Sequence, residues 1–433
     1  MRQSRQPCGH RWIGVAIASF GVVVMAQAQA PGFTLGDAAA LARRQHPLLS
    51  AASGRRIAAT GAARQESALP NPVFEWRKEN YNSPLPRDEF VSLGMPIDLY
   101  GRRIALRSAG GFVASRARSD SSTTARDVEY DVARAYWRTA LAYALHDAAA
   151  SQRYAVDTIA RIETERARQG QVSHGSALRA RLEADRTRLA LSGARAELER
   201  ARGDLARALA LPFDSVPRPT EALHVETTVT ALPLIDALLA IARARRSELF
   251  SAQARVNETV RRRLAEKLGT LPALGVQVGN KRTSGYLTNT LQVGVAVPFF
   301  DRNGGNRERA RGEQLLADGD LRAAQTAVDA QVLSAYRAYR GLLEEYDAAG
   351  DAGLSADGLR TLEQRGATVA GVAGVAYREG EISLFELLDA ERVRADVRST
   401  ALRAAAEVQM ARVELLRAVG LPIDAARFQL DTP

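Results

Sequence analysis

The sequence predicts a mainly α-helical protein that also carries the strands of a membrane β-barrel, built from two copies of one unit. Two similar segments about 210 residues apart, 167–186 (ARQGQVSHGSALRARLEADR) and 377–396 (YREGEISLFELLDAERVRAD), each place a glycine and then a serine between long helical patterns. Short runs of alternating apolar and polar residues separate these patterns at corresponding places in the two halves. A repeated order of elements of this kind indicates an internal duplication.

Residues 1–28 are expected to be a secretory signal peptide. Three arginines precede an apolar run over 12–25, and Ala-Gln-Ala at 26–28 has the small-residue pattern of a cleavage site. The apolar run is shorter than the ~20 residues of a membrane-spanning helix. A retained membrane anchor is the alternative. The single cysteine, Cys8, lies in this segment, so we expect an exported mature chain without disulfides or a lipid anchor.

The first structural repeat is predicted over 29–212. Thr34 is a plausible N-cap for its first helix, Pro47 allows a kink, and a Leu-Pro-Asn-Pro stretch at 69–72 ends that helix. In the second strand Val91, Leu93, Met95 and Ile97 share one face. In chain order the elements are a helix over 36–68, strands over 73–80 and 89–98, a long helix over 103–168, a tip at 169–173 and a helix over 173–210.

A Pro- and Thr-rich stretch over 213–233 reads as a linker, and the same order then returns in a second repeat over 234–422. A tail follows at 423–433. The elements of this repeat are a helix over 234–268, strands over 273–281 and 287–297, a long helix over 306–377, a tip at 378–383 and a helix over 383–419.

Helix lengths predict how these parts are arranged. A helix of about 66 residues, such as 103–168, is about 100 Å long. The two shorter helices of the same repeat together reach about 107 Å, so stacked end to end they would match the long one. The strands would then lie at one end and the tips at the other, with the linker at mid-length.

The strands are long enough to cross an outer membrane when tilted. Four strands cannot close a barrel, and an open sheet edge is not tolerated in lipid. Several copies of the chain must therefore share one barrel. Composition does not choose between two, three or four copies.

These motifs together resemble the TolC-like outer membrane efflux family. The matching pieces are the signal peptide, LPNP before the first hairpin, the paired turns PIDLYGRR and VPFFDRNGGNR, and the tips RQGQVS and REGEIS. The segment VPFFDRNGGNRERARGE (297–313) resembles the cobalt–zinc–cadmium (CzcC-like) subgroup of heavy-metal efflux components. The resemblance implies a homotrimer, with a barrel of twelve strands in the outer membrane, a periplasmic barrel of twelve helices and an equatorial belt formed by the linker and termini.

The function implied by this resemblance is a passive exit duct, and not an enzyme. A periplasmic adaptor would join it to an inner-membrane pump, expected to be proton-driven, and heavy-metal cations would be the cargo. A drug or type I protein-secretion duct of the same fold is one alternative. An exported periplasmic coiled-coil structural protein is an alternative from another class.

Two groups of residues are candidate sites by the same resemblance. The tips would dock the adaptor, although they could also serve only to close hairpins. Glu386 and Asp389, three residues apart on one helix face, match the acidic pair that lines the family's closed aperture. Ser176 and Arg179 replace them in the first repeat, and an ordinary solvated face is the alternative. The docking candidates are Arg168, Gly170, Gln171, Val172, Ser173, Arg378, Gly380, Glu381, Ile382 and Ser383.

Other classes of function lack support in the sequence. The formal net charge is +10, but the arginines alternate with Asp and Glu along helical patterns, which is typical of solvated helices rather than of a nucleic-acid interface. The histidines are scattered without metal-ligand spacing, and no nucleophile–base grouping or phosphate loop is evident. We therefore predict no catalytic residue, no resident metal and no cofactor.

Overall fold

The computed structural model of the protein describes residues 32–80, 84–223, 232–351 and 358–423. The predicted signal peptide and all but the first residue of the predicted tail lie outside these residues. All helices and strands belong to the second of two units, Phe33–Pro433. Within the described residues, no helix combines the length and the apolar composition needed to cross a membrane.

The described chain is mainly helical and has one small antiparallel sheet, which confirms the predicted mixture of elements. In each half of the chain, helices come first, then a pair of strands, and then helices again. The first half contains α1 (Leu35–Gln45), α2 (Pro47–Glu66), β1 (Val73–Glu79), β2 (Asp88–Ile97), α3 (Arg102–Arg168), α4 (His174–Leu209) and the short 3-10 helix η1 (Phe213–Ser215). The second half contains α5 (Ile235–Arg245), α6 (Ser247–Leu268), β3 (Ala273–Thr283), β4 (Tyr286–Ala296), α7 (Gly304–Asp351), α8 (Gly358–Glu379) and α9 (Leu384–Val419).

The single helices predicted over 36–68 and 234–268 are each divided in two. His46 has an extended backbone (ψ 126°) directly before Pro47, the position where the sequence allows a kink. Arg246 is also extended (ψ 115°), and this break has no sequence signal. The predicted helix over 306–377 corresponds to α7 and α8, and residues 352–357 between them lie outside the described part of the chain.

The break at Arg246 has a tertiary cause. Its buried guanidinium donates hydrogen bonds to the carbonyls of Ala418 (2.9 Å) and Arg417 (3.5 Å) at the end of α9, and to Gln331 of α7 (2.9 Å). The last carbonyls of a helix have no partner within the helix, so these bonds satisfy groups that would otherwise be buried unpaired.

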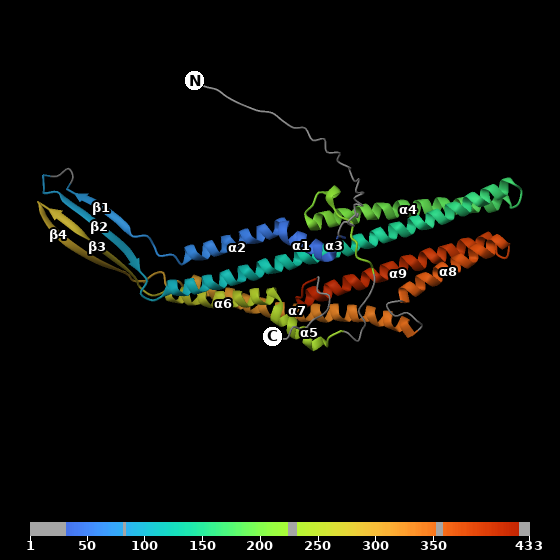
Figure 1. The fold of residues 1–433 in the computed structure, drawn as a ribbon. Coiled ribbons are helices and arrows are strands. Elements are labelled where there is room, and N and C mark those ends of the chain that lie inside the picture. Colours follow the sequence, from blue (N-terminus) through green and yellow to red (C-terminus); the bar gives the residue numbers. More distant parts are fainter. Residues whose placement is uncertain (1–31, 81–83, 224–231, 352–357, 424–433) are drawn as a thin grey trace, which may run out of the picture. The chain divides into compact units, whose positions relative to one another are not determined.

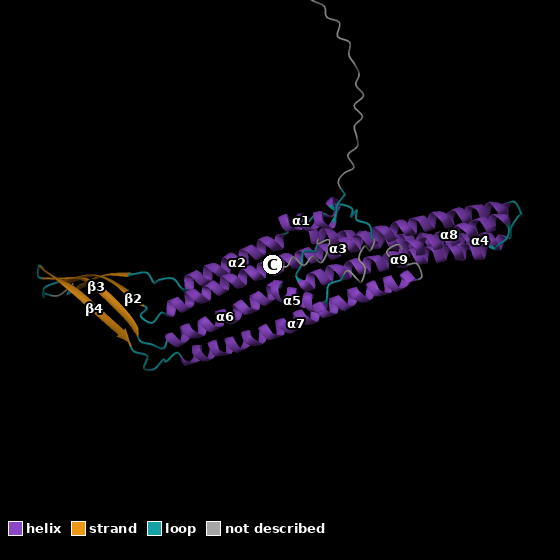
Figure 2. Cartoon of the chain, turned by 60° about the horizontal axis from the view of Figure 1, so that its bottom comes forward, coloured by secondary structure: helices purple, strands orange, loops and turns teal. Residues whose placement is uncertain are grey.

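Helix α3 is the longest element and contacts both halves of the protein. Near the sheet it packs against α2 and α6, and towards the other end it packs against α4 and α9. The sheet lies at one end of the helices, and the α3–α4 and α8–α9 turns lie at the other (Figures 1 and 2).

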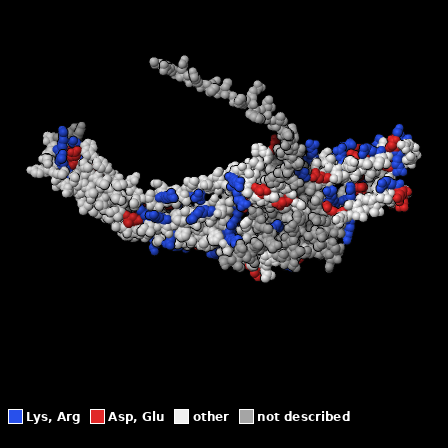
Figure 3. All heavy atoms as spheres, in the orientation of Figure 1, with Lys and Arg blue, Asp and Glu red and all other residues white. Residues whose placement is uncertain are grey.

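The sheet has the order β1-β2-β3-β4, with every neighbouring pair antiparallel. One face is apolar and exposed. Its register sets Phe74, Leu93, Val278 and Leu291 in a row across all four strands. On the other face Gln277 donates to Ser92 (2.6 Å) and Glu75 (2.9 Å). Charged side chains gather at the end of the sheet far from the helices. The rest of the sheet carries few charged side chains in the view of Figure 3.

Two corresponding hydrophobic clusters stabilise the middle of the helical region. In the first, Tyr136 of α3 is fully buried beside Leu205 and Leu209 of α4. In the second, Tyr339 of α7 packs with Leu343 and with Leu415 of α9. The Tyr136 hydroxyl donates to the carbonyl of Phe33 (2.9 Å), and burial raises the pKa of this phenol to about 12. Phe33, near the start of the described chain, is thereby fixed to α3.

A buried carboxylate joins the helices between this region and the sheet. Glu258 of α6 is 2% exposed and forms ion pairs with Arg116 of α3 (2.9 Å), Arg262 (3.0 Å) and Arg255 (3.2 Å). Arg262 in turn donates two hydrogen bonds to Glu66 of α2 (2.7 and 2.9 Å). Three helices from both halves thus share one charge network.

Replacing Glu258 by Leu is expected to destabilise the protein by about 1–3 kcal/mol, because its three partly buried arginine partners would lose their shared carboxylate. The control Asp329→Asn breaks an exposed pair with Arg243 (2.7 Å), and exposed pairs contribute about 1 kcal/mol or less. Denaturant unfolding in detergent, followed by far-ultraviolet circular dichroism, measures both variants. Equal unfolding midpoints for the two would contradict a stabilising role for the network.

Candidate functional site

The two predicted tips have the same backbone. Gly170 (φ 75°) joins α3 to α4, and Gly380 (φ 83°) joins α8 to α9. In each turn the residue after the glycine donates its N–H to a carbonyl of the preceding helix at 2.9 Å: Gln171 to Arg166, and Glu381 to Ala376. A left-handed residue at this position ends a helix with its carbonyls satisfied, and glycine adopts it without strain.

A serine begins the helix that follows each turn, and the two caps differ. The Ser173 hydroxyl accepts a hydrogen bond from the N–H of Ser176 (3.1 Å). The Ser383 hydroxyl accepts from the N–H of Glu386 (3.3 Å), and the Glu386 carboxylate accepts in return from the N–H of Ser383 (2.7 Å). Hydrogen bonds from the backbone and then from the hydroxyl of Ser383 lower the pKa of Glu386. Glu386 therefore completes a capping box for α9.

The tips place the docking candidates at one end of the helices, and most of these side chains are exposed. Arg168 is held by Glu165 (2.6 Å), and Arg378 donates to the carbonyl of Gly374 (3.1 Å). Val172 and Ile382 are half-buried beside their turns. Both tips therefore present backbone and polar groups around a small apolar residue.

A polar cluster that the sequence did not indicate joins the two hairpins close to the tips. Glu163 of α3 is fully buried and accepts hydrogen bonds from Tyr377 of α8 and from Ser176 of α4 (3.0 Å). Arg166 donates to the Tyr377 hydroxyl at 3.1 Å. Burial, and then the hydrogen bond to Glu163, raise the pKa of Tyr377 to about 12. Removing any of these hydrogen-bond partners would leave a buried carboxylate less well satisfied and would therefore cost free energy.

A second polar link lies about two helical turns along α4 from Ser176. Arg392 of α9 donates two hydrogen bonds to Glu183 of α4, one of them at 2.8 Å, and the second closes a bidentate pair. The hydrogen bond from Arg392 is the main cause that lowers the pKa of Glu183. Each hairpin therefore holds the other through a fixed charge pair as well as through the tip cluster.

The gate candidates lie between these two links. Glu386 and Asp389 are both exposed and three residues apart on α9, so their side chains share a face. Arg392 follows Asp389 by three residues on that face. No group of three or more His, Cys, Asp or Glu side chains that could hold a metal ion occurs within the described residues.

Comparisons with known proteins identify the fold. No protein-family model matches the sequence. No curated protein matches it either. Among solved structures, the Campylobacter jejuni CmeC outer membrane channel superposes with a TM-score of 0.74 at 15% identity, covering 89% of this chain and 85% of that one. The Neisseria gonorrhoeae MtrE outer membrane channel, in its open state, gives 0.72 at 18% (90% and 89% covered), and CusC gives 0.71 at 17% (90% and 93%). The chain has the fold of these outer membrane channels over nine-tenths of its length.

Proposed function

We propose that the protein is the outer-membrane exit duct of a tripartite efflux system and extends into the periplasm of a Gram-negative bacterium. The observation that carries this proposal is the combination of an open-edged sheet, apolar on one face, with helices of channel length. Helix α3 has 67 residues and is therefore about 100 Å long. An enzyme would need reactive side chains gathered in a pocket, whereas a passive duct needs only helices and strands that enclose a channel.

A homotrimer would complete the membrane part. Strands β1 and β4 form the two edges of the described sheet and have unpaired backbone groups. Lipid does not tolerate such edges, and three copies would supply the twelve strands of a closed barrel. The apolar face with Phe74 and Leu291 would contact outer membrane lipid, and the face with Gln277 would line the lumen.

The tips are proposed to dock a periplasmic adaptor that recruits an inner-membrane pump, expected to be proton-driven. Their support is the shared turn geometry and the exposure of Gln171 and Glu381 beside the glycines. An approaching helical hairpin could contact the turns closely, because no Cβ lies on Gly170 or Gly380.

Glu386 and Asp389 are proposed to form the aperture gate. In a trimer their six carboxylates would surround one constriction and favour cations. The cargo would be heavy-metal cations of the cobalt, zinc or cadmium type, which rests on the likeness of residues 297–313 to the heavy-metal subgroup. A drug or protein-secretion duct is the competing assignment within the same fold.

The gate is tested with Glu386→Gln combined with Asp389→Asn. Glutamine retains the capping box, so the helix start should survive while the charge is lost. Divalent-cation block of single-channel conductance in lipid bilayers is expected to weaken about tenfold or more. The matched control, Asp185→Asn on α4, removes an exposed carboxylate outside the gate and should leave the block unchanged. An unaltered block in the double variant would rule out the gate.

We further propose that the tip cluster, which consists of Glu163, Arg166, Ser176 and Tyr377, holds the two hairpins together while the channel is closed. Tyr377→Phe, which removes the hydroxyl that joins α8 to Glu163, tests this role. Hydrogen bonds to a charged group contribute about 1.5–3 kcal/mol, so openings should become about tenfold more frequent. The pH dependence gives a second readout. The folded pKa of Tyr377 lies above the ordinary 10.0, so its contribution is fully present below pH 10 and is lost as the pH rises towards about 12.

Wild-type channels are therefore expected to open more often as the pH rises through this window, and Tyr377→Phe channels should lack that step. The control Tyr154→Phe alters an exposed tyrosine of α3. The same alkaline step in wild type and in Tyr377→Phe would exclude the cluster as the cause.

The cargo is tested in a strain from which the gene is deleted. Zinc, cobalt and cadmium sensitivity should rise and should be restored by the wild-type gene but not by the charge-neutral gate variant. Increased sensitivity to drugs alone would overturn the metal assignment and favour the competing duct.

A further inference from the structure

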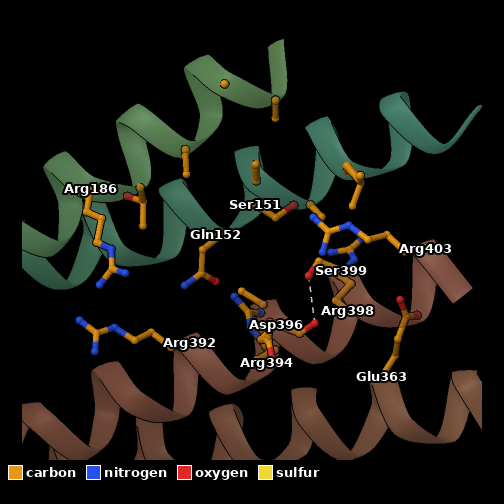
Figure 4. Close-up of a pocket in the computed structure, with 18 of the residues that line it drawn as sticks. Ser151, Gln152, Arg186, Glu363, Arg392, Arg394, Asp396, Arg398, Ser399 and Arg403 are labelled. Atoms are coloured by element: carbon orange, nitrogen blue, oxygen red, sulfur yellow. Dashed lines mark hydrogen bonds between the residues drawn. The ribbon is translucent and has the colours of Figure 1, made fainter. Parts of the chain in front are cut away.

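A pocket of about 950 Å³ lies between the α3–α4 hairpin and the α8–α9 hairpin, on the side of the gate candidates away from the tips (Figure 4). Small apolar side chains form much of its wall, among them Ala148, Ala190, Ala194 and Ala367. This volume falls at the upper end of the range of about 300–1,000 Å³ for ligand pockets. A passive duct needs no such pocket, so its lining calls for an explanation of its own.

Arginines outnumber carboxylates in the polar part of the lining, five to four. Five line the pocket, and two of them are already paired: Arg392 with Glu183, and Arg394 with Glu391 (2.7 Å). The other three make no hydrogen bond or ion pair with any described residue; they are Arg186 of α4 and Arg398 and Arg403 of α9.

The positions of these arginines concentrate positive charge. In Figure 4 the guanidinium groups of Arg186 and Arg392 extend towards each other from opposite hairpins. Arg398 and Arg403 lie towards the other end of the pocket, about two and three turns further along α9 from Arg392 (Figure 4). Like charges that lie near each other at one end of the pocket repel one another, and a bound anion would reduce that repulsion.

Acidic residues offset only part of this charge. Four line the pocket, and Glu183 and Glu197 are paired with Arg392 and Arg200 (2.6 Å). Glu363 and Asp396 form no ion pair within the described residues. Three unpaired arginines therefore face two unpaired carboxylates, and the balance favours an anionic ligand.

Gln152 supplies a second, independent observation. Its amide points into the pocket from α3 (Figure 4), and its Oε1 is buried without a hydrogen-bond donor among the described residues. A buried acceptor without a donor costs free energy. A rotation of the amide about its terminal torsion would bring this oxygen to the pocket surface, where a ligand hydroxyl would satisfy it.

We propose that this pocket binds an organic anion with an apolar ring system and a hydroxyl group. The alanine walls would pack against the rings, Arg398 and Arg403 would donate charge-assisted hydrogen bonds to the anionic groups, and Gln152 would accept the hydroxyl. The site is distinct from the gate, because Arg403 lies about 21 Å along α9 from Asp389.

The probe is pyranine, a hydroxylated pyrene trisulfonate, used at mildly acidic pH so that its hydroxyl remains protonated. Purified full-length protein in a nonionic detergent is titrated into the dye, and fluorescence anisotropy reports binding. We expect saturable binding that weakens about tenfold or more in the Arg398→Gln/Arg403→Gln variant. Glu363→Gln should strengthen binding about threefold, a gain that a misfolded variant would not give.

Two controls separate the pocket from general surface charge. Arg195→Gln removes an exposed arginine of α4 that lies outside the pocket, and it should leave the affinity for pyranine unchanged. Ala190→Trp fills the pocket without changing its charge and should abolish binding. Circular dichroism confirms that each variant is folded. The proposal is overturned by a lack of saturable binding, by equal losses in Arg195→Gln and Arg398→Gln/Arg403→Gln, or by full binding in Ala190→Trp.

Discussion

The length of α3 is the constraint on which the rest of the helical region depends. A helix of 67 residues gains little from its own hydrogen bonds in water and needs apolar contacts along its whole length. Shorter helices provide these contacts in sequence, α2 and α6 near the sheet and α4 and α9 near the tips. Their ends meet at mid-length, where Arg246 satisfies the last carbonyls of α9 and the Tyr136 and Tyr339 clusters exclude water. These contacts at mid-length therefore hold together helices that come from both halves of the chain.

The two copies of the predicted repeat share the backbone of their tips and differ in the chemistry of those tips. Both glycines are left-handed and both serines cap a helix. In the first copy the residue three after the serine is Ser176, which donates to the buried Glu163 of the neighbouring helix. In the second copy it is Glu386, which bonds back to its own cap. The first tip thus uses this position to hold Glu163, which in turn accepts from Tyr377 of the other hairpin. The second tip leaves a carboxylate at the surface.

The sequence predicted the features that depend on local chemistry. Breakers, caps and alternation mark the elements because glycine, proline and serine act on neighbouring backbone groups. It could not predict the break at Arg246, since the carbonyls that this side chain satisfies belong to residues about 170 positions later. The same holds for Glu163 and Tyr377, which are 214 residues apart and meet only after the hairpins pack. Either residue alone looks like part of a solvated helix face.

Charge along one face of α9 relates the gate candidates to the pocket. Asp389, Arg392, Asp396 and Arg403 recur at helical spacing, so their side chains lie on the same side with alternating sign. At about 0.1 M salt the Debye length is about 10 Å, which is half the separation of Asp389 and Arg403. A cation at the first and an anion at the second would therefore interact weakly. Arg392, one turn from Asp389, is instead close enough to repel a bound cation, and its bidentate bonds to Glu183 offset much of that charge. The link that holds the hairpins together would thereby also keep the proposed gate pair available to cations.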